Sequence, residues 1–576
     1  ELLAEAPGLR VSRSFRGAEV RSQGLSPRHT LVLVDGFRLV GRIDGVMDLS
    51  RFDTRRIARV EVVPGASSAL YGSDALGGVI NLVTRRPTPG LHVEGSAQGG
   101  ALGSVDASAH VAYAVGPWSM QLSGGWHRND AWDLDTRDRS TSGPARSSGD
   151  LGLRLAWRKD ATREVALLVD VQNVATKALE ARGPVALFDR RSATDIGGVG
   201  VQVVTPLFGG SVQAGARVSA MRHQFLYDQR GGAAEDSYEN ARETLATATT
   251  QWHRTLPGGH GLAVGVDGLG ESLTSNRTSE DRVARGRIAV FAQDDWRVRS
   301  DGALAIQGGV RAVMDSAFGS ALAPNLGVRW SPRPALALRL GVGTGFRAPD
   351  AKERFLRFEN GSAGYVVKGN PDLDPERSTS IQASVIWRPL RRPGSLGLRR
   401  WSAGLDAHIT WVRDLVTTQS EGVVGTSQIY SYRNIDQART QGTVTWVRWR
   451  ARRLVTAQLA WTWLDAMDLA RDRPLQGRAP HALSFSLRAR VPVTRTRLVA
   501  RIAAWHSRPR YEDRDGDGQE EQHSSPGYTQ IDLRIEQAFG SRFVAHIGLD
   551  NALDAGAEPD LLLKPRLWMI GVRARL

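Results

Sequence analysis

The densest group of metal-ligating residues lies near the C-terminus, in the stretch "DRDGDGQEEQHS" at residues 513–524. Asp513, Asp515 and Asp517 stand at alternate positions and are followed by Gly518, which matches the start of an EF-hand loop. Position twelve of that pattern is Ser524, where an EF-hand has Glu. Carboxylate oxygens at this spacing suit calcium. We expect either a weak calcium site in an outward-facing loop or a solvated acidic loop, and no other cofactor.

Residues for covalent catalysis are not assembled in this sequence. There are no cysteines, which excludes thiolate metal sites, thiol nucleophiles and disulfides. The 12 histidines are dispersed without an H-E-x-x-H pair, and no Ser-His-Asp arrangement follows from their spacing. We therefore predict no catalytic residues and a protein that is not an enzyme.

The formal charge of +15 is carried almost wholly by arginine, because the chain has only five lysines. Most arginines are scattered through strand-like segments, and the densest run, "WVRWRARR" at 446–453, falls where a strand should end in a turn. No nucleic-acid-binding motif surrounds it. We interpret the charge as an arginine-lined surface or lumen, with a weaker role in attracting anionic ligands, and predict no nucleic-acid partner.

The elements that carry these residues are short segments of alternating polarity. "TQIDLRIEQAF" at 529–539 puts Ile531, Leu533 and Ile535 on one face of a strand and charged side chains on the other. No run of 18 apolar residues occurs, which excludes a helical membrane protein. The pattern leaves a soluble β-sandwich or a membrane β-barrel, and a propeller is not supported because no repeat of about 40–50 residues is found.

Three features favour an outer-membrane barrel over a sandwich. The polar strand faces carry full charges, short turns alternate with long polar loops, and tryptophan is abundant at 16 residues. We predict interfacial positions for Trp118, Trp132, Trp157, Trp296, Trp387 and Trp505. Short turns are predicted near Pro117, Asp160 and Gly540. Long loops are predicted at 129–149, 345–378, 417–437, 464–480 and 509–526.

Residues 1–90 differ from the rest of the chain. "HTLVLVDGFRLVG" predicts two strands joined by a turn, and "DTRRIARVEVVPG" predicts a helical turn followed by a strand at Val60–Val63. We therefore divide the chain into a small mixed α/β domain at 1–90 and a barrel at 91–576. Because the sequence starts at Glu1 without Met or a signal peptide, we expect the first domain to be N-terminally truncated.

Four stretches carry a family resemblance that spans nearly the whole chain: "TLVLVDGFRL", "RIARVEVVPGASSALYGSDALGGVINLVTRRP", "GFRAPDAKERF…GNPDLDPERS" and "HIGLDNALD…PRLWMIGVRARL". In this order they resemble the TonB-dependent outer-membrane receptors and transporters, most of all the cobalamin and catecholate-siderophore receptors. The resemblance implies a 22-stranded antiparallel transmembrane β-barrel with the N-terminal domain as a plug inside the lumen. Divided among 22 strands, residues 91–576 leave about 22 residues for each strand and connection, enough for a spanning strand of about 9–11.

The resemblance also implies where a ligand is contacted. The plug apices of the family match Arg42, Ile43 and Asp44 in "GRIDG". They also match Ser67, Ser68, Leu70 and Tyr71 in "SSALYG". Two basic plug residues that pair with barrel glutamates in many members are replaced here by Gln23 and Pro64. We therefore expect the plug to be held mainly by hydrogen bonds and shape fit.

These patterns predict a receptor in the bacterial outer membrane that imports a scarce bulky solute, a ferric siderophore or a cobalamin-like ligand. The expected partners are TonB of the inner-membrane energising complex, the small-molecule or metal-chelate ligand and outer-membrane lipid, and we expect a monomer. The family's TonB box lies before the plug, ahead of Glu1. The alternatives are a passive, porin-like or hydrolytic barrel, a sugar or peptide receptor, and a soluble all-β binding protein.

Overall fold

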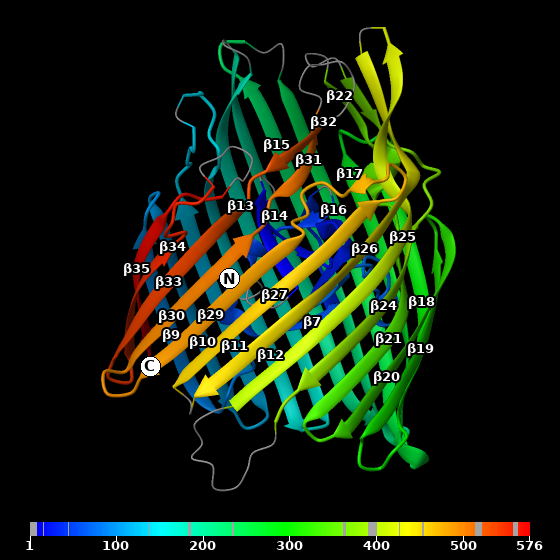
Figure 1. Cartoon of the computed structure of the whole chain (residues 1–576), viewed down its shortest axis with the longest axis vertical. Helices are drawn as coiled ribbons and strands as arrows, with labels where there is room; N and C mark the ends of the chain where they lie inside the picture. The colour runs from blue at the N-terminus through cyan, green and yellow to red at the C-terminus, as the bar shows by residue number, and fades with distance from the viewer. Residues whose placement is uncertain are drawn as a thin grey trace.

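We describe the protein from a computed structural model of the whole chain (Figure 1). The structure describes residues 8–14, 17–43, 45–135, 137–182, 186–232, 236–360, 365–389, 400–425, 427–451, 454–512, 521–556 and 563–576. Strands dominate it, and among these residues no helix is long and apolar enough to cross a membrane.

The chain after the N-terminal domain closes into a barrel of 22 antiparallel strands, as predicted. The first and last strands pair, with Met569 opposite Gly100, so the sheet has no free edge. The barrel strands are β9 (Gly90–Gly100), β10 (Ser104–Val115), β11 (Trp118–Asn129), β12 (Ala145–Asp160), β13 (Arg163–Arg182), β14 (Ala186–Leu207), β15 (Gly210–Gln229), β16 (Ser237–Leu256), β17 (His260–Ser275), β18 (Val283–Arg297), β19 (Leu304–Asp315), β20 (Gly319–Arg333), β21 (Leu336–Arg347), β24 (Glu376–Trp387), β25 (Arg400–Val424), β26 (Ser427–Ala451), β27 (Val455–Asp468), β29 (His481–Val491), β30 (Thr496–Trp505), β33 (Tyr528–Phe539), β34 (Phe543–Asp550) and β35 (Leu567–Arg575).

The outer wall of the barrel is apolar because each strand alternates between its two faces. On β14, Val199 and Val201 are exposed, and on β18 the same holds for Ile288 and Val290. The residues between them face the lumen, where Ala289 is buried. Such a wall is stable in lipid, because every strand also satisfies its backbone hydrogen bonds in the closed sheet.

The two ends of the barrel differ in their connections. At one end strands meet in tight turns, as predicted near Pro117, Asp160 and Gly540. The opposite end carries long connections that contain α2 (Ala351–Phe355), β22 (Arg357–Asn360), β23 (Tyr365–Lys368), β28 (Arg473–Pro474), β31 (Arg508–Glu512) and β32 (Glu521–Ser525). A further short helix, η5 (Pro257–Gly259), lies in a turn at the first end. Long loops face outward in outer-membrane barrels, which orients the chain.

Two details of the sequence prediction are wrong. Residues 417–437 do not form a loop: β25 and β26 remain paired up to Val424 and Ser427, and this hairpin rises above the rim (Figure 1). Its polar residues lie outside the membrane and can face water on both sides of a paired ribbon. Trp132 is not interfacial either: it is 8% exposed and pairs with Gly143 inside an outer loop, whereas Trp118 at a strand end is 62% exposed.

The N-terminal domain lies inside the barrel (Figure 1, blue). Its central sheet has the order β4-β3-β8-β7, and β3 and β8 are parallel. Leu31, Leu33, Ala75 and Val79 form one buried core on this sheet. The elements are β1 (Leu9–Ser14), β2 (Gly17–Ser22), η2 (Pro27–His29), β3 (Thr30–Val34), β4 (Phe37–Arg38), β5 (Arg42–Ile43), β6 (Val46–Met47), η3 (Leu49–Arg51), η4 (Thr54–Arg56), β7 (Ile57–Pro64), α1 (Ser68–Tyr71) and β8 (Gly78–Thr84).

Candidate ligand-binding site

A cleft opens between the plug and the barrel wall on the side of the long loops; we call it the upper cleft. Its space, including the part open to solvent, is about 1080 Å³. The plug contributes Arg42 and Ile43, and the opposite side is formed by β15 to β18 and α2. Charged lining residues from the barrel side are Glu243, Glu271, Arg285, Asp350 and Lys352. A cleft with charges of both signs and apolar patches can bind a bulky polar solute.

Arg42 is held in place by Asp74, which also joins the two predicted sets of site residues. Arg42 Nη1 lies 3.5 Å from Asp74 Oδ2, and Arg38 Nη1 lies 3.0 Å from the same atom. Arg38 also donates to the carbonyls of Tyr71 and Ser73. Burial raises the pKa of Asp74, but the charges of Arg42 and Arg38 outweigh it and hold that pKa well below its ordinary value. Asp74 is therefore ionised and fixes the "GRIDG" hairpin beside α1.

The second predicted set packs against the barrel. Ser68 is buried, and its Oγ accepts a hydrogen bond of 3.1 Å from the backbone N–H of Phe346 on β21. Tyr71 packs on the plug core, and Ser67 donates to the carbonyl of Gly65. Leu70 is half-buried in the same short helix. Ligand contact by Ser67, Ser68, Leu70 and Tyr71, as by Arg42 and Ile43, stays a prediction.

Several predicted positions lie outside the described residues. Asp44 is one, and the calcium candidates Asp513, Asp515 and Asp517 are the others. In the part of the chain that the structure describes, no group of three or more His, Asp or Glu residues could hold a metal ion. Calcium binding by the acidic stretch therefore stays a prediction.

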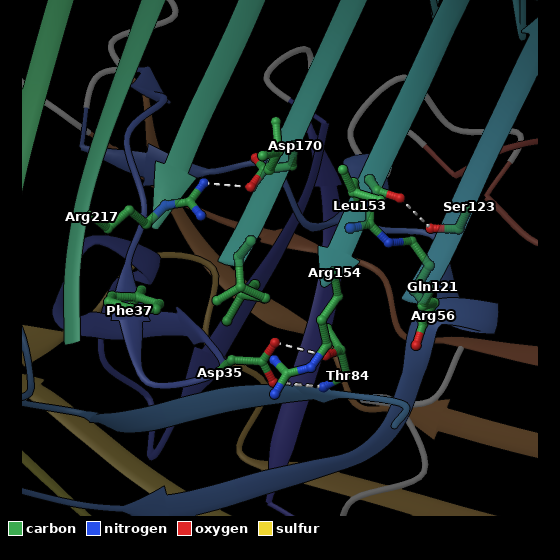
Figure 2. A pocket seen from close by; sticks show the side chains of 14 residues that line it. Asp35, Phe37, Arg56, Thr84, Gln121, Ser123, Leu153, Arg154, Asp170 and Arg217 are labelled. Carbon is green, nitrogen blue, oxygen red and sulfur yellow. Dashed lines mark hydrogen bonds and ion pairs between the residues drawn. The ribbon is translucent and has the colours of Figure 1, made fainter. Parts of the chain in front are cut away.

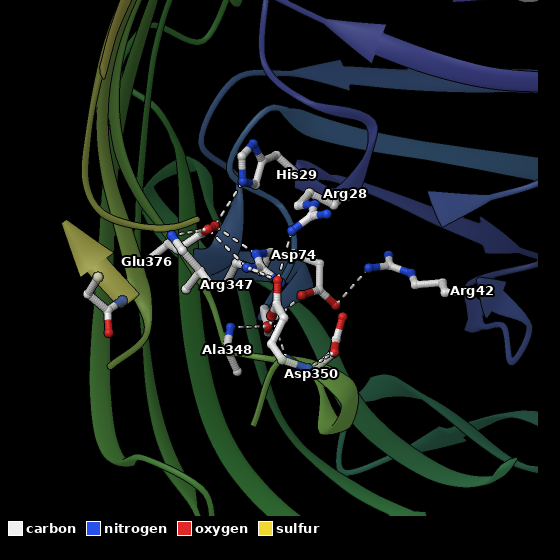
Figure 3. A network of polar contacts seen from close by, with 12 residues as sticks. Arg28, His29, Arg42, Asp74, Arg347, Ala348, Asp350 and Glu376 are labelled. Carbon is white, nitrogen blue, oxygen red and sulfur yellow. Dashed lines mark hydrogen bonds and ion pairs between the residues drawn. The ribbon is translucent and has the colours of Figure 1, made fainter. Parts of the chain in front are cut away.

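The plug is tied to the barrel by a buried set of charges that we call the Arg347 network: Arg28, His29, Arg347, Glu353 and Glu376 (Figure 3). Arg347 ends β21 and donates to both barrel glutamates, at 2.7 Å to Glu376 and 2.9 Å to Glu353. The plug adds Arg28, 2.8 Å from Glu353, and His29 Nε2, 2.8 Å from Glu376. These glutamates are almost fully buried, so their charges need these partners.

The expectation that hydrogen bonds and fit alone hold the plug is thus incomplete. Position 64 is indeed tied by a hydrogen bond, from Gln382 Nε2 to the Pro64 carbonyl at 3.0 Å. Ion pairs nevertheless cross the junction, and they come from Arg28 and His29 rather than from positions 23 and 64. Gln23 itself has a buried Oε1 without a partner in the described structure. The signal was present in the sequence, because the barrel side of this network lies in "GFRAPDAKERF…GNPDLDPERS".

A local motif also places Glu353. Asp350 caps α2 by accepting from the Glu353 backbone N–H, and the Glu353 side chain accepts from the Asp350 N–H in return. This capping box orients Glu353 towards Arg347. Burial and the charge of Glu353 raise the pKa of Asp350 to about 6, although Arg347 opposes the shift.

A second cavity, the lower cavity, lies between the plug sheet and the wall nearer the tight-turn end (Figure 2). Its space is about 440 Å³, and Asp35, Thr84, Arg154 and Arg217 are among its lining residues. Asp35 accepts from Thr84 Oγ1 at 2.7 Å and from its backbone N–H at 2.8 Å, which pins the β3–β4 turn to the end of β8. The two cavities share no lining residue, and β3 and β4 lie between them.

A closed barrel with an apolar outer wall and a plug that separates two cavities defines a gated outer-membrane protein. The family comparisons agree: residues 95–552 match the model described as "TonB dependent receptor-like, beta-barrel", and residues 1–79 match "TonB-dependent Receptor Plug Domain". The chain belongs to the TonB-dependent receptor family and to the bacterial outer membrane. Members of this family are transporters and receptors rather than enzymes.

Individual relatives are distant but cover most of the chain. An iron-regulated outer membrane virulence protein of Vibrio cholerae is 26% identical over 96% of this chain and 85% of its own length. The vitamin B12 transporter BtuB of Photobacterium profundum is 24% identical over 84% of this chain and 76% of its own. The solved siderophore receptor PirA of Acinetobacter baumannii superposes with a TM-score of 0.79 at 14% identity, covering 99% of this chain and 94% of its own. The last comparison shows the shared fold alone.

Proposed function

We propose that this protein binds a ferric siderophore or a cobalamin-like solute in the upper cleft and imports it with energy from TonB. The observation that carries the proposal is the separation of the upper cleft from the lower cavity by β3 and β4 of the plug. A passive pore needs a continuous water-filled path, whereas a plugged barrel needs work to open one. The relatives named as iron-regulated and as a vitamin B12 transporter support the same two classes of solute.

The proposed mechanism uses no covalent chemistry. A solute enters between the outer loops and rests on the plug surface around Arg42 and Ile43. TonB then pulls on the plug from the periplasm, and the Arg347 network and the hydrogen bonds to the wall yield in the part that moves. The solute passes into the periplasm, and the plug returns because its ion pairs re-form.

Uptake in living cells tests this proposal. A host that lacks its own iron-chelate and cobalamin receptors, with and without TonB, would express the protein that carries this chain. Radiolabelled ferric chelates and cyanocobalamin are then supplied at limiting concentration. We expect accumulation of one class of solute only in the host with TonB. Equal accumulation in both hosts would contradict energised import and favour a passive channel.

A further inference from the structure

Four arginines converge where the plug meets the outer loops, and we call them the Arg10 cluster: Arg10, Arg21, Arg478 and Arg508. Arg10 and Arg21 are directly opposite each other on the plug hairpin β1–β2. Arg478 belongs to the loop after β27, and Arg508 begins β31. Like charges placed opposite on paired strands repel, so this arrangement is unfavourable by itself.

Gly477 is the point at which these three elements meet. Its carbonyl accepts from Arg10 Nη1 at 3.1 Å, and its N–H donates to the carbonyl of Pro509 at 2.8 Å. A β-carbon built on Gly477 would lie 3.6 Å from Arg21 Nη1. Arg478 donates from Nε to the plug carbonyl of Gly24 at 2.9 Å. The backbone contacts therefore hold the four guanidinium groups close to one another.

Counter-charge for the cluster is sparse. Glu19 Oε1 lies 3.4 Å from Arg21 Nη2, and its carboxylate is shared with Ser12. Within the described residues, Arg10 Nε, Arg21 Nε and both Nε and Nη2 of Arg508 are buried without a hydrogen-bond partner. Burial, followed by Arg21 and Arg10, lowers the pKa of Arg478 to about 9. Buried donors of one charge sign without acceptors are complete only when an anion is bound.

We propose that the Arg10 cluster is an oxyanion site that takes a carboxylate or catecholate group of the imported ligand. The inference rests on the proposed function and deepens it, because it assigns an anionic chelate rather than a corrinoid as the cargo. Guanidinium groups bind such oxygen pairs in a forked, charge-assisted geometry. Since two of the arginines belong to the plug and two to outer loops, a bound anion also joins the loops to the plug.

Binding to the purified protein in neutral detergent tests the site. The probes are an anionic iron(III) tris-catecholate, a neutral iron(III) tris-hydroxamate and inorganic phosphate, followed by quenching of tryptophan fluorescence. We expect Arg10→Gln and Arg478→Gln each to weaken binding of the anionic chelate about tenfold and to leave the neutral chelate unchanged. Arg357→Gln is the matched control, because this outer-loop arginine is 70% exposed and should change neither.

Three outcomes decide the proposal. Unchanged binding of the anionic chelate by both variants would overturn it, and so would equal loss for the neutral chelate, which indicates a structural role. Saturation by inorganic phosphate at micromolar concentration would assign the site to free phosphate instead of the ligand. Partial recovery in Arg478→Lys would support a charge-based site. Absence of TonB-dependent uptake with normal chelate binding would refute the proposed function and leave the site standing.

Discussion

The Arg347 network and the Arg10 cluster both lie at the junction of plug and barrel, but their charges are arranged in opposite ways. In the network two buried glutamates face Arg347 and Arg28, and His29 completes one of them. In the cluster four arginines face the single carboxylate of Glu19 among the described contacts. Matched charges stabilise the closed plug, whereas unmatched charges leave donors for a ligand. The same residue type thus serves attachment in one place and, as we propose, recognition in the other.

The largest expected effect is loss of the central charge of the network. Arg347→Met leaves Glu353 and Glu376 buried with plug partners only, and we expect plug stability to fall by about 3–5 kcal/mol. Urea-dependent release of a spin label placed on the plug would measure it. The double variant Arg347→Met with Glu376→Gln is the control and should recover part of the loss. A single variant as stable as the wild type would show that the network does not hold the plug.

A smaller loss is expected from the plug side. Arg28→Gln removes one charge-assisted bond to Glu353, while Arg347 still satisfies that carboxylate. Because Arg28 is partly exposed, we expect a loss of about 1–2 kcal/mol in the same assay. A loss as large as that of Arg347→Met would mean that the plug, rather than the wall, neutralises Glu353.

The pH dependence of the network should depend on Asp350. Its pKa of about 6 lies above the ordinary value, so the folded state prefers the protonated form. This contribution to stability is complete below about pH 4 and is lost as pH rises through 6. We expect the thermal midpoint to be higher at pH 5 than at pH 7, and this difference to disappear in Asp350→Asn. Asp74 does not mask it, because its lowered pKa acts only in more acidic solution. An unchanged difference in Asp350→Asn would assign the effect to another group.

The smallest expected effect has the opposite sign. Arg10→Gln relieves repulsion with Arg21 in the ligand-free protein, so plug stability at low salt should rise by about 0.2–1 kcal/mol. High salt should remove the gain, because it screens the repulsion. A clear loss of stability would show that Arg10 supports the fold and would weaken the contrast between the two regions.

The sequence predicted the barrel, the plug and their order, because alternation and family motifs are local signals. It also pointed to Arg42 and Ile43, which line the upper cleft. It did not predict the partners of Glu353 and Glu376, since Arg28 and His29 lie more than 300 positions away along the chain and only the closed barrel brings them together. The Arg10 cluster was hidden for the same reason: its members come from the first hairpin and from two late loops.

The central claim is that the solute passes only when the plug separates from the wall, and an engineered disulfide tests it most directly. The chain has no cysteine, so Ser73→Cys with Ala348→Cys introduces a single pair, at a site where Ser73 Oγ and the Ala348 N–H are 3.2 Å apart. The control variants carry one cysteine each. We predict that the oxidised double variant binds its chelate normally but does not import it, and that reduction restores import. Import by the oxidised form at the rate of the single variants would contradict the account.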